Sequence, residues 1–235
     1  MISLALATIA TVGLLAPQDA PPASVNLTRS WEKGEKQAYT LDLSFEGDAF
    51  EGQSVTAFVA FTLEVQEALE NGEARVQASY EKVSLKLGGE ELPGIDLPKE
   101  IVAVYGANGL PKKLALDNPD DPVAMVLPAF FVPGKELKIG EETSFKWSSE
   151  DGSLELKGTV QLVATGRLYE EHVAMLKYTM ESAGKELPPG KFEFTSYVNS
   201  KTGKLVKAEG SLSAEDAELG GEIKGNFVIK KVRNV

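Results

Sequence analysis

This chain of 235 residues carries 24 basic and 35 acidic side chains, which gives a net charge of −11. An acidic surface repels phosphate backbones and anionic headgroups, so nucleic acid and anionic membranes are disfavoured as partners. The absence of cysteine excludes disulfides, thiol catalysis and zinc–thiolate sites, and the single histidine, His172, excludes a site that needs two imidazoles.

Residues 1–23 have the composition of an export signal and its cleavage region. Ile2 to Ala16 is an uninterrupted apolar and small-residue run, too short to span a bilayer comfortably but suited to a signal-peptide core. We expect cleavage after Ala16, Ala20 or Ala23, and export to the periplasm, cell envelope or exterior without a transmembrane segment in the mature chain. Because no basic residue precedes the run, we suspect that the true translation start lies further upstream. The alternative is an N-terminal membrane anchor.

Residues 27–117 are expected to form a first β unit. Lys36 to Phe45 alternates apolar and polar side chains, as a half-buried antiparallel strand does. Ser54 to Ala68 continues this alternation over roughly 50 Å, a length that suggests a strongly coiled sheet. Asn71-Gly72 then predicts a tight hairpin turn.

The partner strand of this hairpin is predicted at Ala74 to Leu87. Its apolar phase switches near Glu81-Lys82, which is the pattern of a β-bulge. Two shorter strands are expected to complete the unit, at Ile101–Tyr105 and Leu110–Leu116.

Residues 118–136 form a predicted connector with one short helix. Asp121 before Pro122 has the pattern of an N-cap followed by proline at the first helical position. The helix is expected over Val123–Phe131 and should stop or kink at Pro128.

Residues 137–235 are predicted to be a second β unit that repeats the first. Val163 to Met180 echoes the first hairpin, with Tyr178 at the position of Tyr80. Its strands are expected at Glu142–Ser149, Leu154–Leu168, Glu171–Met180, Phe192–Val198, Lys204–Ser213 and Glu222–Val232. The fold class is therefore all-β, with about eleven long curved antiparallel strands in two similar units of about five to six strands. The units form either one continuous curled sheet or two packed half-barrels.

The sequence carries no recognisable catalytic, cofactor or metal motif. Asp117, Asp120 and Asp121 offer oxygens to Ca²⁺ but fit no EF-hand spacing, so capping and a solvated turn explain them more simply. His172 lies beside Glu170 and Glu171, yet no nucleophile motif accompanies it. We therefore expect no enzyme activity, no cofactor and no metal.

The apolar run Val123 to Pro133 is the most suggestive segment for function. It is expected either to plug the core between the units or to form a lid over an apolar cavity within a curled sheet. In the second case the protein would bind an apolar or amphipathic ligand, such as a lipid or the acyl chain of a lipoprotein. The expected binding residues are Phe58, Phe61, Met125, Leu127, Phe130 and Phe131. The alternative is a structural or protein-interaction module of the envelope, with a filled core and a protein partner.

Two turn-and-strand patterns carry a resemblance to a known group. The motif Phe131-x-Pro133…Leu137-x-x-Gly140-Glu141-x-x-Phe145 resembles the linker of bacterial secreted, duplicated all-β proteins of unknown function. The hairpins Tyr105…Gly109 and Tyr197…Gly203 resemble a strand–turn–glycine–strand element of the same group. At fold level this group is similar to the periplasmic lipoprotein-carrier half-barrels, which implies a long curved sheet closed by helices over Leu27 to Val232. No site residue follows from the resemblance.

Overall fold

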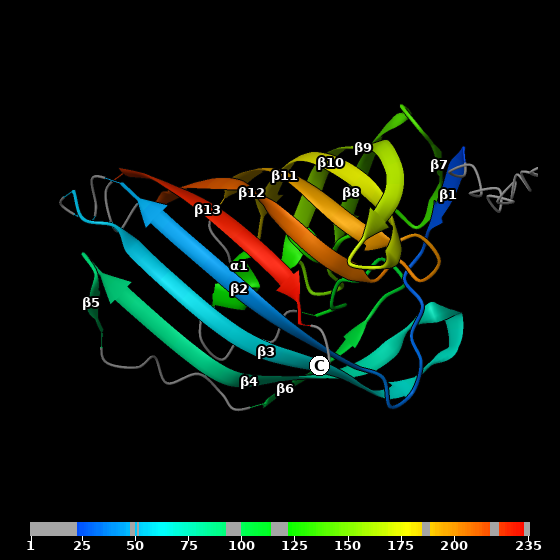
Figure 1. The fold of residues 1–235 in the computed structure, drawn as a ribbon, viewed down its shortest axis with the longest axis horizontal. Coiled ribbons are helices and arrows are strands. Elements are labelled where there is room, and N and C mark those ends of the chain that lie inside the picture. The colour runs from blue at the N-terminus through cyan, green and yellow to red at the C-terminus, as the bar shows by residue number, and fades with distance from the viewer. Residues whose placement is uncertain are drawn as a thin grey trace, which may run out of the picture.

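The computed structural model describes residues 23–47, 50, 52–92, 100–113, 122–184, 189–216 and 221–232. One antiparallel sheet of eleven strands dominates it, in the order β5-β4-β3-β2-β13-β12-β11-β10-β9-β8 with β6 beside β4 (Figure 1). This confirms the predicted all-β class. The strands are β1 (Ser24–Leu27), β2 (Lys36–Glu46), β3 (Val55–Ala68), β4 (Ala74–Leu87), β5 (Glu90–Glu91), β6 (Glu100–Tyr105), β7 (Lys135–Lys138), β8 (Glu142–Ser148), β9 (Glu155–Leu168), β10 (Glu171–Ala183), β11 (Gly190–Asn199), β12 (Leu205–Asp216) and β13 (Gly221–Lys231).

The sheet is continuous across the two halves of the sequence. β2 pairs with β13 from Tyr39 opposite Lys231 to Glu46 opposite Lys224. Of the two predicted arrangements, the strands therefore follow the single curled sheet, and no barrel closes. In Figure 1, β2 to β5 run along the lower side and β9 to β12 along the upper side, with the short helix α1 (Pro122–Met125) between them.

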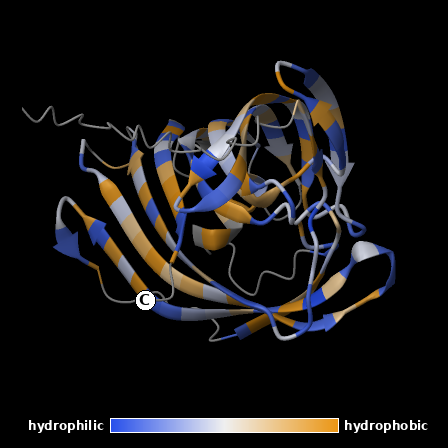
Figure 2. Ribbon diagram, turned by 45° about the vertical axis from the view of Figure 1, so that its right-hand side comes forward, coloured by the Kyte–Doolittle hydropathy of each residue, from blue (hydrophilic) through white to orange (hydrophobic). Residues whose placement is uncertain are grey.

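Alternating side chains explain the long strands, as Figure 2 shows by the change of hydropathy along each ribbon. In β2 every second residue from Gln37 to Phe45 is buried, and β3 repeats the pattern. At the β3–β4 turn Asn71 and Gly72 have φ of 60° and 73°, as the predicted hairpin requires.

The predicted bulge in β4 is confirmed. Ala60 lies opposite Lys82, but the next residue, Phe61, lies opposite Tyr80, so Glu81 has no partner in β3. An extra residue shifts the phase by one and increases the local twist of the strands. It keeps the apolar residues on both sides of the bulge on the same inner face.

Inner-face glycines let this sheet coil tightly around large side chains. Gly210 lies between Phe194 and Phe227, and a Cβ on it would approach the Cβ of Phe194 to 2.3 Å. Gly225 lies opposite Phe45 in the same way, with a Cβ position 2.6 Å from the ring. A residue without a side chain beside an aromatic ring is a recognised means of bending a sheet.

The connector helix is shorter than expected. It consists of α1 (Pro122–Met125) and a 3₁₀ turn, η3 (Leu127–Phe130), that contains Pro128. The helical path breaks at Val126, two residues before Pro128, because the proline has no N–H with which to continue the α-helical hydrogen bonds of α1. Asp121, the predicted N-cap, lies outside the described residues, as do Asp117, Asp120 and the N-terminal run Ile2 to Ala16.

The prediction of a strand at Leu110–Leu116 is wrong for residues 110–113, the part of this segment that the structure describes. There the chain makes one bridge, Tyr105 with Pro111, and then leaves the sheet. Lys112 N–H donates to Val104 O at 2.7 Å, while Lys112 O accepts from Glu150 N–H at 2.8 Å. The segment therefore joins β6 to the β8–β9 turn instead of extending the sheet.

Candidate ligand-binding face

The interior of the curl is filled by aromatic rings, several of them from the predicted ligand site. Phe130 lies 5.4 Å from Tyr39 and 6.4 Å from Phe61, measured between ring centroids. Phe131 lies 4.5 Å from Phe145. Phe61, Leu127, Phe130 and Phe131 are buried, with exposed fractions of 1%, 7%, 8% and 4%. These four predicted site residues belong to the hydrophobic core.

Hydrogen bonds hold the connector in this core. The Tyr178 hydroxyl donates to Phe131 O at 2.8 Å, and the Ser196 hydroxyl donates to Ala129 O at 3.5 Å. Val132 N–H donates to Asn108 O at 2.9 Å. Burial raises the pKa of Tyr178 far above its ordinary value, so the hydroxyl keeps its proton and stays a donor. The connector is therefore bound as a plug whose carbonyls find partners on the sheet.

The other two predicted site residues lie apart from these four. Phe58 belongs to the opposite phase of β3 and is half-buried on the outer face, with Lys82 Nζ 5.7 Å from its ring centroid. It lines a shallow outer groove of about 510 Å³ with Asp42 and Lys86. Met125, on α1, is half-buried beside the core.

One end of the concave face keeps partly uncovered apolar side chains. Leu87, Val55, Phe45 and Gly225 lie side by side on four neighbouring strands. Residues close to these four in sequence therefore lie at the same end of the sheet. α1 packs against β3 and carries Met125, which is half-buried against the core. We call this half-buried set the rim; its members are Phe50, Val55, Val83, Leu85, Met125 and Ile223.

A pocket of about 530 Å³ lies at the same end of the sheet, beside the rim. Its lining includes Ala214, which pairs with Ile223 of the rim, and the buried Leu156. Charged residues complete the lining, among them Lys191 and the ion pair of Lys157 with Glu181 at 2.8 Å. Apolar and cationic groups therefore meet at this end.

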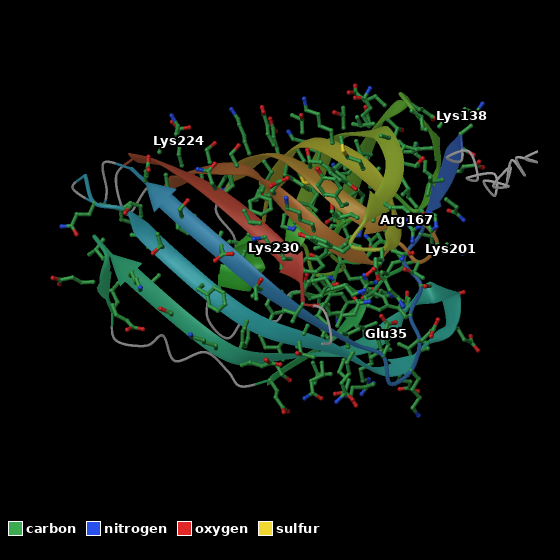
Figure 3. The ribbon with its side chains drawn as sticks, in the orientation of Figure 1. Glu35, Lys138, Arg167, Lys201, Lys224 and Lys230 are labelled. Carbon is green, nitrogen blue, oxygen red and sulfur yellow. The ribbon has the colours of Figure 1, made fainter. Side chains whose placement is uncertain are left out.

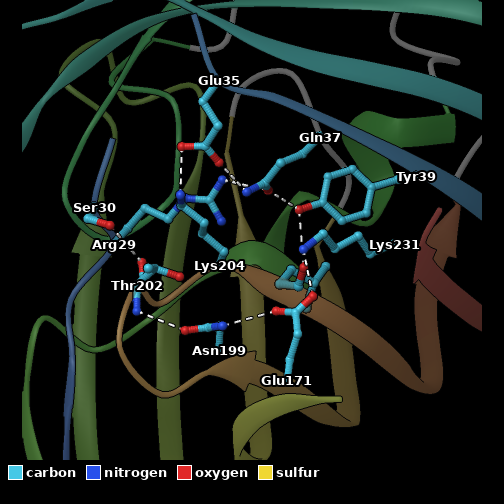
Figure 4. A network of polar contacts seen from close by, with 11 residues as sticks. Arg29, Ser30, Glu35, Gln37, Tyr39, Glu171, Asn199, Thr202, Lys204 and Lys231 are labelled. Carbon is cyan, nitrogen blue, oxygen red and sulfur yellow. Dashed lines mark hydrogen bonds and ion pairs between the residues drawn. The ribbon is translucent and has the colours of Figure 1, made fainter. Parts of the chain in front are cut away.

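The opposite end of the concave face is closed by a polar network (Figure 4). Gln37 is central to it: its amide oxygen accepts from Arg29 Nη2 at 3.0 Å and from the Tyr39 hydroxyl, and its amide nitrogen donates to Glu35. Glu35 also pairs with Lys204 Nζ at 2.7 Å. The Arg29 guanidinium lies 4.3 Å from the ring centroid of Trp31. These hydrogen bonds and the ion pair offset part of the free-energy cost of taking the charges of Arg29 and Glu35 out of water.

Tyr39 carries this network into the core. Its single hydroxyl proton is shared between Gln37 and a second acceptor, Leu205 O at 3.2 Å, which lies in the second half of the sequence. Burial raises the pKa of Tyr39 to about 12, although the neighbouring Arg29 charge lowers it. The hydroxyl is therefore protonated at any physiological pH.

Glu171 forms the second branch of the network, and His172 does not join it. Glu171 accepts from Lys231 Nζ at 2.6 Å and from Asn199 Nδ2 at 3.0 Å. Burial by itself raises the pKa of Glu171, but these hydrogen bonds and the Lys231 and Lys204 charges hold it below its ordinary value. His172 is exposed beside it. A carboxylate whose pKa is lowered by lysine is a poor general base.

Sequence reasoning missed this network, although a signal was present. Gln37 occupies the apolar phase of the strand that continues through Tyr39, Leu41 and Leu43. A polar residue in that phase needs a buried partner, which here is Arg29.

The outer face is polar and charged. Figure 3 shows Lys224 and Lys230 on β13, and both are exposed. Within the part of the chain that the structure describes, no cluster of three or more histidine, aspartate or glutamate side chains could hold a metal ion. No helix there is long and apolar enough to cross a membrane.

Comparisons with known proteins find similarity in structure only. No family model matches the chain, and no curated protein matches its sequence. The chain is similar over 87% of its length to 97% of a candidate lipoprotein from Parabacteroides distasonis, at 10% identity and a TM-score of 0.33. It is similar over 88% of its length to 89% of a LolA superfamily protein from Nitrosomonas europaea, at 10% identity and a TM-score of 0.20. Similarity at these TM-scores carries no functional argument.

Proposed function

We propose that this protein binds an apolar or amphipathic ligand, such as a lipid acyl chain, without catalysing a reaction. The observation that carries the proposal is the rim: half-buried apolar side chains remain at one end of the concave face, while the polar network closes the other end. Partly covered apolar groups inside a concave sheet are a favourable surface for an apolar ligand.

The rim suits a chain that lies along the sheet rather than one that enters the core. Phe61 and Phe130 leave their places only if the core is disrupted, because their rings pack against each other and against Tyr39. Phe131 is held in the same way by Phe145 and Tyr178. An acyl chain over Val55, Val83 and Leu85 would gain roughly 0.8 kcal/mol for each CH₂ group that it removes from water. The ammonium groups of the neighbouring pocket, such as Lys191, would attract an anionic headgroup.

We also propose that the protein works outside the cytoplasm, in the periplasm, cell envelope or exterior. The proposal is supported by the apolar composition of Ile2 to Ala16, which is typical of a signal-peptide core. The lack of cysteine is compatible with such a compartment but does not require it.

The close packing of the aromatic plug favours a second candidate, a structural or protein-interaction module with a filled core. In that case the rim would meet a protein partner of the envelope rather than a lipid. The two candidates differ in whether a small apolar molecule binds to the isolated protein.

The test is uptake of a fluorescent fatty acid by the mature protein, together with native mass spectrometry of protein purified from its own envelope fraction. We expect saturable uptake and a co-purifying lipid. Leu85→Asp and Met125→Asp place a charge on the rim and should abolish uptake, because burying an unpaired carboxylate is costly. Phe58→Asp, on the outer face, is the matched control and should bind normally.

Circular dichroism is the control for correct folding of each variant. No uptake by the natural sequence would refute the lipid proposal and leave the interaction module. An equal loss of uptake in Phe58→Asp would show that the ligand does not bind at the rim.

A further inference from the structure

Among the strands that the structure describes, β8 (Glu142–Ser148) ends the sheet and pairs on one side only, with β9. At its two ends, Leu162 N–H donates to Glu141 O at 3.1 Å and Ser149 N–H donates to Leu154 O at 2.8 Å. Hydrogen-bonded positions alternate along an antiparallel ladder, so the odd-numbered residues of β8 bond to β9. Glu142, Ser144, Lys146 and Ser148 therefore direct their main-chain N–H and C=O groups away from β9. Among the described residues, these groups have no main-chain partner.

The edge at the other side of the sheet differs, because the chain that follows β6 bonds to its last residues. The end of β6 is bonded through the Tyr105–Pro111 bridge and the hydrogen bond from Lys112 N–H to Val104 O. A free edge of seven residues is a template for another strand unless it is blocked. β8 has no proline, and no bulge interrupts its pairing with β9.

The side chains of β8 are complementary to a second copy of the same strand. Glu142, Ser144, Lys146 and Ser148 are exposed on the outer face. Across the described ranges, neither Glu142 nor Lys146 has an ion-pair partner within the chain. Phe145 and Trp147 are half-buried on the inner face of the same strand.

We propose that β8 pairs antiparallel with β8 of a second copy, around a two-fold axis at Ser144. This register opposes Ser144 to Ser144 of the second copy as a hydrogen-bonded pair. It also opposes Glu142 of each copy to Lys146 of the other, which makes two symmetric ion pairs. All three pairs use the outward main-chain groups, as strand addition requires.

The charges select this register over its neighbours. An axis at Lys146 would oppose two lysines, and an axis at Glu142 would oppose two glutamates; directly opposed like charges destabilise a strand pair. The interface is one strand wide, so the dimer should be weak and visible at high protein concentration.

The test is sedimentation velocity of the mature chain from ~1 µM to ~1 mM at ~150 mM salt. We expect the weight-average sedimentation coefficient to rise from the value of a monomer toward that of a dimer across this range. Glu142→Lys and Lys146→Glu should each leave a monomer at every concentration. The double variant Glu142→Lys/Lys146→Glu should restore the dimer, because it exchanges the charges of both ion pairs.

Glu193→Lys is the matched control, since it makes the same change of charge on the exposed outer face of β11 and should dimerise normally. Ser144→Pro is an independent variant that removes an outward N–H and should also be monomeric, with folding checked by circular dichroism. A monomer at all concentrations for the natural sequence would overturn the proposal. Failure of the double variant to restore the dimer would overturn the register.

Discussion

At the scale of single residues, two glycines fix the packing of the turns that follow β6 and β11. Gly109 has a φ of 82°, and a Cβ on it would lie 2.4 Å from Phe130 O. Gly203 has a φ of 64°, and its Cβ would lie 2.6 Å from Thr28 O. Each position therefore needs glycine twice, for its left-handed backbone and for the close approach of another main chain. Both glycines end the strand–turn–glycine patterns of the sequence.

We expect Gly109→Ala to destabilise the protein more than Gly140→Ala does. Gly140 has a φ of 84° but nothing within 4 Å of its Cβ position, so alanine there costs only the left-handed strain, about 1–2 kcal/mol. Alanine at 109 adds an overlap with Phe130 O, which should cost about 1–3 kcal/mol more. Urea denaturation of both variants measures the difference. Equal free energies of unfolding would show that the connector moves aside without cost.

At the scale of elements, the bulge at Glu81 decides which face of β4 meets the core. Tyr80, before the bulge, has an even number, whereas Val83 and Leu85, after it, have odd numbers. All three nevertheless lie on the inner face. Without the extra residue, one of the two segments would turn outward, because neighbouring side chains of a strand alternate between its faces.

We expect deletion of Glu81 to be far more damaging than Glu81→Ala. The deletion moves one apolar half of β4 to solvent, at roughly 1.5–3 kcal/mol for each large side chain, so the variant should lose most of its stability. Glu81→Ala keeps the bulge and loses only the exposed hydrogen bond from the Thr62 hydroxyl, at 2.7 Å. That loss should stay within about 1 kcal/mol. Thermal unfolding followed by circular dichroism compares the two. A deletion variant as stable as Glu81→Ala would contradict the role of the bulge.

At the scale of the whole molecule, the β2–β13 pairing joins the halves of the sequence into one sheet. The polar network adds a second link, since Glu35 of the first half pairs with Lys204 of the second. The plug adds a third, because Phe130 packs on Tyr39 and Phe131 packs on Phe145. Two halves that share a sheet and a core should unfold together.

The two tryptophans test this cooperativity, because Trp31 lies in the first half and Trp147 in the second. In Trp147→Phe the fluorescence reports on Trp31, and in Trp31→Phe it reports on Trp147. In each variant we expect the fluorescence midpoint in urea to coincide with that from circular dichroism. Adding Gly109→Ala to Trp31→Phe should lower the Trp147 midpoint, although the substitution lies in the other half. Separate midpoints would indicate two independently folding units.

The features that arise from local patterns of residues could be predicted from the sequence. Period-two alternation predicted nearly every long strand, Asn71-Gly72 predicted its hairpin, and the phase switch at Glu81 predicted the bulge. Parity also separates Phe58 from Phe61 in the same strand, because side chains three residues apart in a strand point to opposite faces. The pair β1–β7 was not predicted, since strands of four residues carry too little pattern.

How distant segments meet could not be predicted and is seen in the folded structure. That β2 pairs with β13, that Phe130 and Phe131 fill the interior, and that Gln37 receives Arg29 all depend on contacts between residues on different elements. An apolar run predicts that a segment will be buried, but it does not predict whether the segment covers a cavity or fills it. Whether the segment fills the interior depends on the shape of the surrounding sheet, because side chains pack to fill the available volume.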